Sequence, residues 1–144
     1  MGTSWIQGAV NDSRAGVLAL RPDLAEHVER FDAQASESIG PRLRTLLEIR
    51  VAQLLRDQTT LSSADPALVT VVSNWSSDPS VNKVERAALE VCEVFLMDHH
   101  SITDDQIIRL HQLLGDQGAV AVLMNIAMLD GFTKFRRVFS EGAI

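Results

Sequence analysis

The amino-acid sequence predicts an all-α protein, a single domain of six to seven helices. Apolar residues recur at helical spacing in segments that are bounded by proline, glycine and helix-cap signals. No window shows the strict alternation of apolar and polar residues that is typical of a half-buried strand. The 144 residues, 46% of them hydrophobic, are enough to build one sizeable core. We therefore assign residues 1–144 to one bundle-like helical domain.

The segment 1–20 carries loop signals rather than a clear helical pattern. It contains three glycines and the run Asn11-Asp12-Ser13. This composition suits a loose N-terminal arm or a segment that crosses to a neighbouring subunit, and the sequence does not choose between them.

Three helices of the first half are predicted to begin at prolines, because proline suits the first turn of a helix. Pro22 opens a helix over about 22–36. Gly40-Pro41 marks a break and begins a helix that ends near residue 56. Asp65-Pro66 repeats the same signal for a short helix through about residue 74.

The second half contains a loop over 76–80, a long helix over about 81–98 and two further helices. Thr103 and Gln106 have the spacing of a capping box, which predicts a helix start. Gly115 is expected to end that helix. Asp116 can then cap the last helix, which extends to about residue 140.

The predicted last helix is apolar around nearly its whole circumference. Its apolar residues are Val120, Val122, Leu123, Met124, Ile126, Met128 and Leu129. A helix of this kind must be buried on every side. It is therefore either a central core helix or a face shared with another subunit, and we expect a homo-oligomer formed through the C-terminal helices.

Charge and targeting signals limit the partners. The formal net charge of −6 argues against nucleic acid, because phosphate binding needs a basic face. The N-terminus lacks the basic and apolar regions of a signal peptide. The apolar run 119–132 includes Asn125 and Asp130 and is shorter than a membrane span. We therefore expect a cytoplasmic protein that binds neither nucleic acid nor membranes.

Cysteine and histidine offer little chemistry. Cys92, the single cysteine, falls at the centre of the apolar face of its predicted helix, so we expect an inert thiol. The four histidines lack the spacing that places two metal ligands on one helical face. We expect no metal and no cofactor, and we expect His111 to be partly buried beside a local hydrogen-bond partner.

Two charged residues fall inside apolar helix faces. Arg50 lies within the apolar arc of the helix 41–56, and Glu85 lies within that of the helix 81–98. Because an unpaired charge in an apolar interface is costly, we expect the two to form an ion pair between these helices. Alternatively, they line a small polar pocket together with Glu48.

Much of the chain resembles a known superfamily. The stretch PRLRTLLEIRVAQL at 41–54 resembles a helix of the carboxymuconolactone decarboxylase and AhpD-like alkylhydroperoxidase superfamily that precedes the active site. Trp75, the segments 84–89 and 102–106, and the apolar stretch 121–132 with Phe135 and Arg136 are similar to the family's later helices. This resemblance implies an AhpD-like bundle that assembles into oligomers.

The chain departs from the family at the active site. Active members carry a Cys-x-x-Cys pair and a histidine after that helix, with an upstream glutamate in a proton relay. Glu48 matches the glutamate in approximate position only, and the expected cysteine and histidine positions fall near Thr60, Ser63 and Ala67. A dithiol peroxidase needs one thiolate to attack and a second thiol to resolve the sulfenic acid. We therefore expect the family's usual peroxidase activity to be absent.

Two main functional interpretations follow. In the first, which we favour because the family's chemistry is missing, the chain is a divergent AhpD-like oligomer with at most a pocket for a small anionic ligand. In the second, it is an active lyase or oxidoreductase that uses Glu48, Arg50 and His111. A third interpretation is a subunit that needs a different partner protein to complete its surface.

Overall fold

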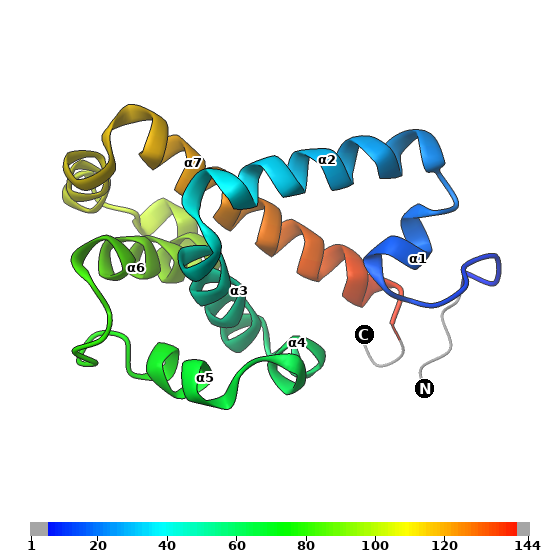
Figure 1. Cartoon of the computed structure of the whole chain (residues 1–144), viewed down its shortest axis with the longest axis horizontal. Helices are drawn as coiled ribbons and strands as arrows, with labels where there is room; N and C mark the ends of the chain where they lie inside the picture. Colours follow the sequence, from blue (N-terminus) through cyan, green and yellow to red (C-terminus); the bar gives the residue numbers. More distant parts are fainter. Residues whose placement is uncertain (1–5, 141–144) are drawn as a thin grey trace.

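The structure, a computed structural model, describes residues 6–140. Over this range the chain is all-helical and contains no strand, which confirms the predicted fold class (Figure 1). The elements in chain order are α1 (Arg14–Leu18), α2 (Pro22–Ile39), α3 (Pro41–Leu55), α4 (Gln58–Ser63), α5 (Pro66–Ser73), α6 (Lys83–Asp98), the 3-10 helix η1 (His99–Ser101) and α7 (Asp104–Val138).

Helices α3, α6 and α7 form the centre of the bundle. Each of the three packs against the other two, and α2 lies along α7 (Figure 1). The short helices α4 and α5 pack against α3 on the side away from α2 (Figure 1). This arrangement leaves α3 surrounded by other helices, and seven of its fifteen residues are buried.

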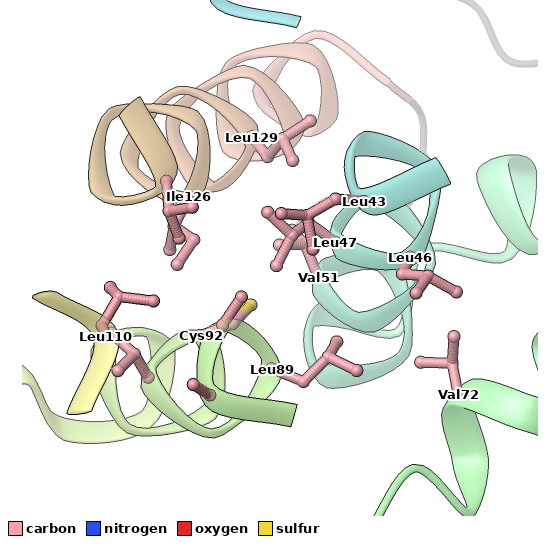
Figure 2. Close-up of a cluster of buried hydrophobic side chains, with 14 of the residues drawn as sticks. Leu43, Leu46, Leu47, Val51, Val72, Leu89, Cys92, Leu110, Ile126 and Leu129 are labelled. Carbon is pink, nitrogen blue, oxygen red and sulfur yellow. The ribbon is translucent and has the colours of Figure 1, made fainter. Parts of the chain in front are cut away.

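The hydrophobic core lies where these helices meet (Figure 2). Leu46 and Leu47 come from α3, Leu89 comes from α6, and Leu110 and Ile126 come from the two halves of α7; all five are fully buried. Burying a leucine or isoleucine side chain stabilises a fold by roughly 1.5–3 kcal/mol. The core therefore depends on residues that are up to 80 positions apart in the chain.

The predicted helix starts are largely confirmed. Proline lies in the first turn of α2, α3 and α5. Thr103 and Gln106 form the predicted capping box of α7. A second capping box, between Asn82 and Glu85, starts α6 two residues later than expected.

Gly115 divides α7 into two halves. Its φ of 72° and ψ of −177° are not helical, which confirms that Gly115 ends the helix begun at Thr103. A side chain at this φ would strain the backbone, so glycine is the residue that suits it. Asp116, expected to cap the second half, instead bonds to the ring of His111.

Three short elements were not predicted. Helices α1 and α4 and the 3-10 helix η1 have at most six residues each, too few to display a helical period. Helix α1 lies within the segment expected as a loose arm or a link to another subunit, but it packs against α2 and α7 of its own chain, with Val17 buried.

Within a single chain the last helix is not buried on every side, so the alternative of a face shared with another subunit stays a prediction. Val122, Ile126 and Leu129 face the core, whereas Val120 is 64% exposed and Met124 is 43% exposed. Within the described residues, α7 is the one helix that is long and apolar enough to cross a membrane by length and composition. The sequence-based prediction that the apolar run is too short to cross a membrane is based on residues 119–132 alone. A third of the most apolar window is buried inside the fold, whereas core helices that pass the same test are mostly buried.

Candidate functional site

A cavity of about 300 Å³ opens between α1, α2, α3, α4 and the second half of α7, and we call it the Glu48 cavity. Its charged lining consists of three arginines and three carboxylates, and its apolar lining comes from α3 and α7. The lining residues are Arg14, Asp32, Arg44, Glu48, Val51, Asp57, Thr60, Leu129, Phe132, Thr133 and Arg136.

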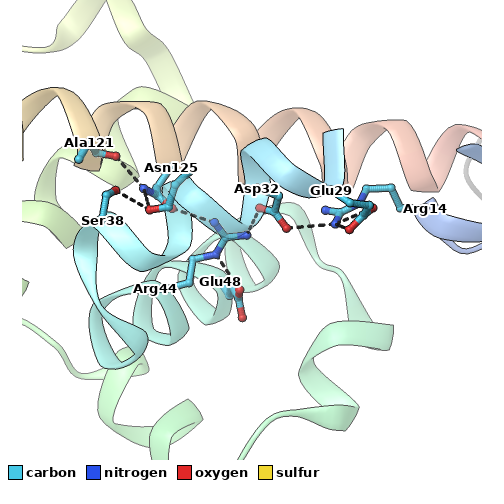
Figure 3. A network of polar contacts seen from close by, with 9 residues as sticks. Arg14, Glu29, Asp32, Ser38, Arg44, Glu48, Ala121 and Asn125 are labelled. Atoms are coloured by element: carbon cyan, nitrogen blue, oxygen red, sulfur yellow. Dashed lines mark hydrogen bonds and ion pairs between the residues drawn. The ribbon is translucent and has the colours of Figure 1, made fainter. Parts of the chain in front are cut away.

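Arg44 connects the cavity to the core (Figure 3). Its side chain is 7% exposed. Its Nε donates to Glu48 at 2.8 Å, and its Nη2 donates to Asp32 at 2.7 Å. Its Nη1 donates to the buried Asn125 amide oxygen at 2.8 Å. A guanidinium with every nitrogen bonded can remain charged in a buried position.

Asn125 in turn joins α7 to α2 (Figure 3). The amide nitrogen of this fully buried residue donates to the carbonyl oxygens of Ala35, at 2.9 Å, and Ala121, at 2.7 Å. Arg44 and Asn125 therefore satisfy each other and hold α2, α3 and α7 together behind the cavity.

Arg14 closes one side of the cavity. Its Nη2 donates to Asp32 at 3.1 Å and to Glu29 at 3.2 Å (Figure 3). Its guanidinium carbon lies 4.2 Å from the centroid of the Phe132 ring, a cation–π contact. Because α1 supplies this arginine, the N-terminal segment takes part in the site.

Asp57 and Arg136 form the opposite side. Asp57 caps α4, accepts a hydrogen bond from the Thr60 hydroxyl at 2.6 Å and forms an ion pair with Arg136. Burial favours the neutral acid, but the bonds from Thr60 and Arg136 outweigh it and lower the pKa of Asp57. The Thr60 hydroxyl therefore donates its hydrogen bond to a carboxylate that also forms an ion pair with Arg136.

The three guanidinium groups and three carboxylates of the lining balance in charge. Glu48, the one of these carboxylates with a well exposed side chain (41%), is bonded to Arg44. Arg14 bonds to carboxylates through Nη2 alone, so its Nε and Nη1 are directed to no described carboxylate. The cavity can therefore offer N–H donors to a ligand and one carboxylate able to accept or donate a proton.

The predicted pair between Arg50 and Glu85 is wrong, because each residue has another partner. Arg50 of α3 forms an ion pair with Glu93 of α6, which also accepts from the indole nitrogen of Trp75 at 2.7 Å. Glu85 bonds to Arg42 at 2.6 Å and closes the capping box of α6. Both are structural contacts between helices.

The candidate catalytic residues Glu48, Arg50 and His111 do not gather in one cavity. Only Glu48 lines the Glu48 cavity. His111 lies on the first half of α7 with its side chain 54% exposed, more open than expected, and its expected local partner is Asp116. Arg50 points to the contact between α3 and α6.

Cys92 is fully buried in the core, as predicted (Figure 2). Burial raises the pKa of its thiol to about 12, so the thiol is neutral at physiological pH. Among residues 6–140, no three histidine, cysteine, aspartate or glutamate side chains gather as a metal site.

Sequence reasoning missed most of the cavity. Arg44 could have been found, because it lies four residues before Glu48 on the same helical face. Arg14, Asp57 and Arg136 come from separate parts of the chain and carry no shared signal. Comparisons with protein-family models, curated proteins and solved structures find no match for this chain.

Proposed function

We propose that this chain is a divergent AhpD-like protein that lacks the dithiol peroxidase site and keeps a small-ligand cavity in its place. The observation that supports this proposal is that Glu48 and Thr60 line the same cavity. These residues lie near the positions that the resemblance assigns to the family's glutamate and first cysteine. The other two positions, Ser63 and Ala67, are exposed and lie outside the lining.

The lining cannot perform thiol chemistry. It contains no cysteine and no histidine, and the hydroxyl of Thr60 is held by Asp57. Cys92 is buried elsewhere with a strongly raised pKa. Reduction of a peroxide by the two-thiol route has no nucleophile here.

The ligand that fits the Glu48 cavity is a small molecule with an anionic group and an apolar part. Arg14 and Arg136 supply N–H donors at the two sides, and their side chains are 24% and 20% exposed. Phe132 and Leu129 supply the apolar surface. Guanidinium groups bind carboxylates well because they can donate two parallel hydrogen bonds.

The assembly that accompanies this function is a homo-oligomer formed through the C-terminal helices. Val120, Met124 and Val138 are apolar, exposed and at helical spacing along one face of α7. Exposed apolar residues that gather on one helix face are a common site of protein association.

Native mass spectrometry of the purified protein, followed by denaturation, tests the ligand. We expect a small co-purifying anion that is released on denaturation and rebinds to the emptied protein. Arg14→Gln should weaken rebinding by roughly five- to tenfold. Arg30→Gln is the matched control, because Arg30 pairs with Glu26 on the exposed face of α2. Equal rebinding by both variants would contradict the proposal.

A peroxidase assay with a dithiol reductant tests the loss of the family's chemistry. We expect the same rate of peroxide consumption from the wild-type protein and from Cys92→Ala. A rate well above the buffer background that disappears in Cys92→Ala would show that a thiol mechanism survives.

The alternative is an active lyase or oxidoreductase, and the exposed carboxylate of Glu48 favours it. With Arg50 and His111 elsewhere, Glu48 would act as the acid or base, and Arg44 would hold its charge. Incubating the released molecule with fresh protein separates the two functions. An unchanged mass supports binding, and conversion that Glu48→Gln abolishes supports catalysis.

A further inference from the structure

A second cavity, of about 400 Å³, lies between the loop that follows α5, the N-terminal part of α6 and the first half of α7. We call it the Trp75 cavity. It shares no lining residue with the Glu48 cavity. The residues that decide its chemistry are Trp75, Lys83, Arg86, Glu90, Arg109 and Leu113.

Arg86 brings a positive charge to this cavity without a direct ion pair to a described residue. Its Nη1 donates to the carbonyl oxygens of Trp75, at 3.0 Å, and Ser76, at 2.7 Å, and its Nη2 donates to that of Asp78 at 2.6 Å. All three acceptors are neutral. The carboxylate of Asp78 is bonded to Ser80 and lies near enough to interact electrostatically with Arg86, but Arg86 forms no ion pair with a described residue.

Lys83 adds a second positive charge. It precedes Arg86 by three residues on the same face of α6 and forms no ion pair with any residue that the structure describes. Arg109 pairs with Glu90 at 2.7 Å, so these two charges cancel. The lining therefore carries a net charge of +2, in a chain whose formal net charge is −6. This concentration of positive charge attracts an anion.

The rest of the lining consists of Trp75, Ala87 and Leu113, together with the polar residues Ser76 and Gln112. Trp75 is partly buried, and its indole nitrogen donates to Glu93 at 2.7 Å, which fixes the orientation of the ring. Leu113, 37% exposed, and Ala87 add apolar surface from α7 and α6. A flat ring system gains most from such a surface, because it can stack on an indole with little loss of conformational entropy.

We propose that the Trp75 cavity binds a small aromatic carboxylate. The carboxylate lies toward Lys83 and Arg86, and the ring lies against Trp75 and Leu113. The cavity volume is within the range of sites for ligands of this size. No covalent step is involved, so the inference concerns binding alone and stands independently of the Glu48 cavity.

Calorimetric titration with 2-naphthoate tests this assignment, with 2-naphthalenemethanol as the uncharged probe of similar shape. We expect 2-naphthoate to bind, to bind more weakly at high salt, and to shift the Trp75 indole N–H resonance. Lys83→Gln should raise its dissociation constant about fivefold. Lys134→Gln, which removes a charge on the far half of α7, should leave it unchanged.

A second pair of variants tests the apolar side. Leu113→Glu places a carboxylate in the cavity at a partly exposed position and should abolish binding, whereas Leu113→Gln should retain it. Because an aromatic carboxylate also fits the ligand class proposed for the Glu48 cavity, Arg14→Gln separates the two sites. Binding that is lost in Arg14→Gln and kept in Lys83→Gln would place 2-naphthoate in the Glu48 cavity and overturn the proposal. The proposal is overturned if 2-naphthoate fails to bind, if the uncharged probe binds equally well, or if Lys83→Gln and Leu113→Glu both leave binding unchanged.

Discussion

Arg44 shows how a buried charge can organise a site. Its three nitrogens bond to residues of α2, α3 and α7, so one side chain holds three helices behind the Glu48 cavity. Glu48 is the solvent-exposed part of this network, but its orientation depends on Arg44, which lies one turn earlier in α3.

We expect Arg44→Met to be among the most damaging single substitutions. Methionine has a side-chain volume similar to that of arginine but no guanidinium group, so Asn125 and Asp32 lose their cationic hydrogen-bond partner. The substitution should therefore lower the free energy of unfolding by about 3–5 kcal/mol. Urea denaturation followed by circular dichroism measures the loss. Arg30→Met, which breaks an exposed pair, should cost no more than about 1 kcal/mol. Similar losses in both variants would refute this role for Arg44.

Cys92 makes the stability of the protein sensitive to alkaline pH. Its thiol has an ordinary pKa of 9.0 in the unfolded chain, and burial raises the pKa to about 12 in the fold. Between these values the native state binds more protons than the unfolded state does, so stability is fully present below pH 9 and falls as the pH rises toward 12.

We therefore expect the free energy of unfolding to decrease above pH 9, by up to about 1.4 kcal/mol per pH unit. Denaturation at pH 8, 9 and 10 measures the slope. The chain has no tyrosine to add a titration in this range. Cys92→Ala should flatten the slope, and the native wild-type thiol should resist a thiol reagent at pH 7 until the protein unfolds. Rapid labelling of the native protein would contradict the assignment.

At the scale of elements, Gly115 decides the path of the chain. Its positive φ turns the first half of α7 away from the second, so that Leu110 and Ile126 can both face the core. A Cβ at Gly115 would meet nothing within 4 Å, so packing does not require glycine there. The backbone conformation alone requires it.

We expect Gly115→Ala to destabilise the protein by about 1–3 kcal/mol. Gly131→Ala is the matched control, because its Cβ also meets nothing within 4 Å and its backbone is helical. That variant should be stabilised by up to about 1 kcal/mol. Thermal denaturation of the two variants gives the signs. A neutral or stabilising Gly115→Ala would mean that the kink is not an intrinsic feature of the fold.

Local signals predicted the long helices well and the short ones badly. Proline in the first turn and the Thr103 capping box act within one turn of the chain, so they can be recognised without knowledge of the fold. Helices α1 and α4 are too short to be stable alone and form because Val17 and Leu61 pack against the bundle.

At the scale of the whole molecule, the exposed face of α7 concerns assembly. Val120 and Met124 lie on this face, whereas the opposite face of the same helix completes the core. A monomer would leave this apolar surface in contact with water, and association would bury it.

We expect the wild-type protein to sediment as a discrete oligomer at micromolar concentration. Val120→Glu combined with Met124→Glu should shift it to the monomer, because the new carboxylates would be desolvated at the interface. Gln34→Glu combined with Gln58→Glu adds the same charge at exposed polar positions and should preserve the oligomer. A monomeric wild type, or two double variants of equal mass, would argue against association through α7.

The sequence by itself determined the all-α class, the starts of the long helices, the break at Gly115 and the inert state of Cys92. These features follow from backbone conformation and from the periodicity of burial, and both depend on residues that are close to one another in the sequence. Only the tertiary structure decided which charges meet. Two helical wheels placed Arg50 and Glu85 on facing surfaces, but a wheel contains no axial position, so it could not show that Glu93 and Arg42 lie closer. The Glu48 cavity was hidden for the same reason, because its arginines come from α1, α3 and α7 and gather only when the bundle closes.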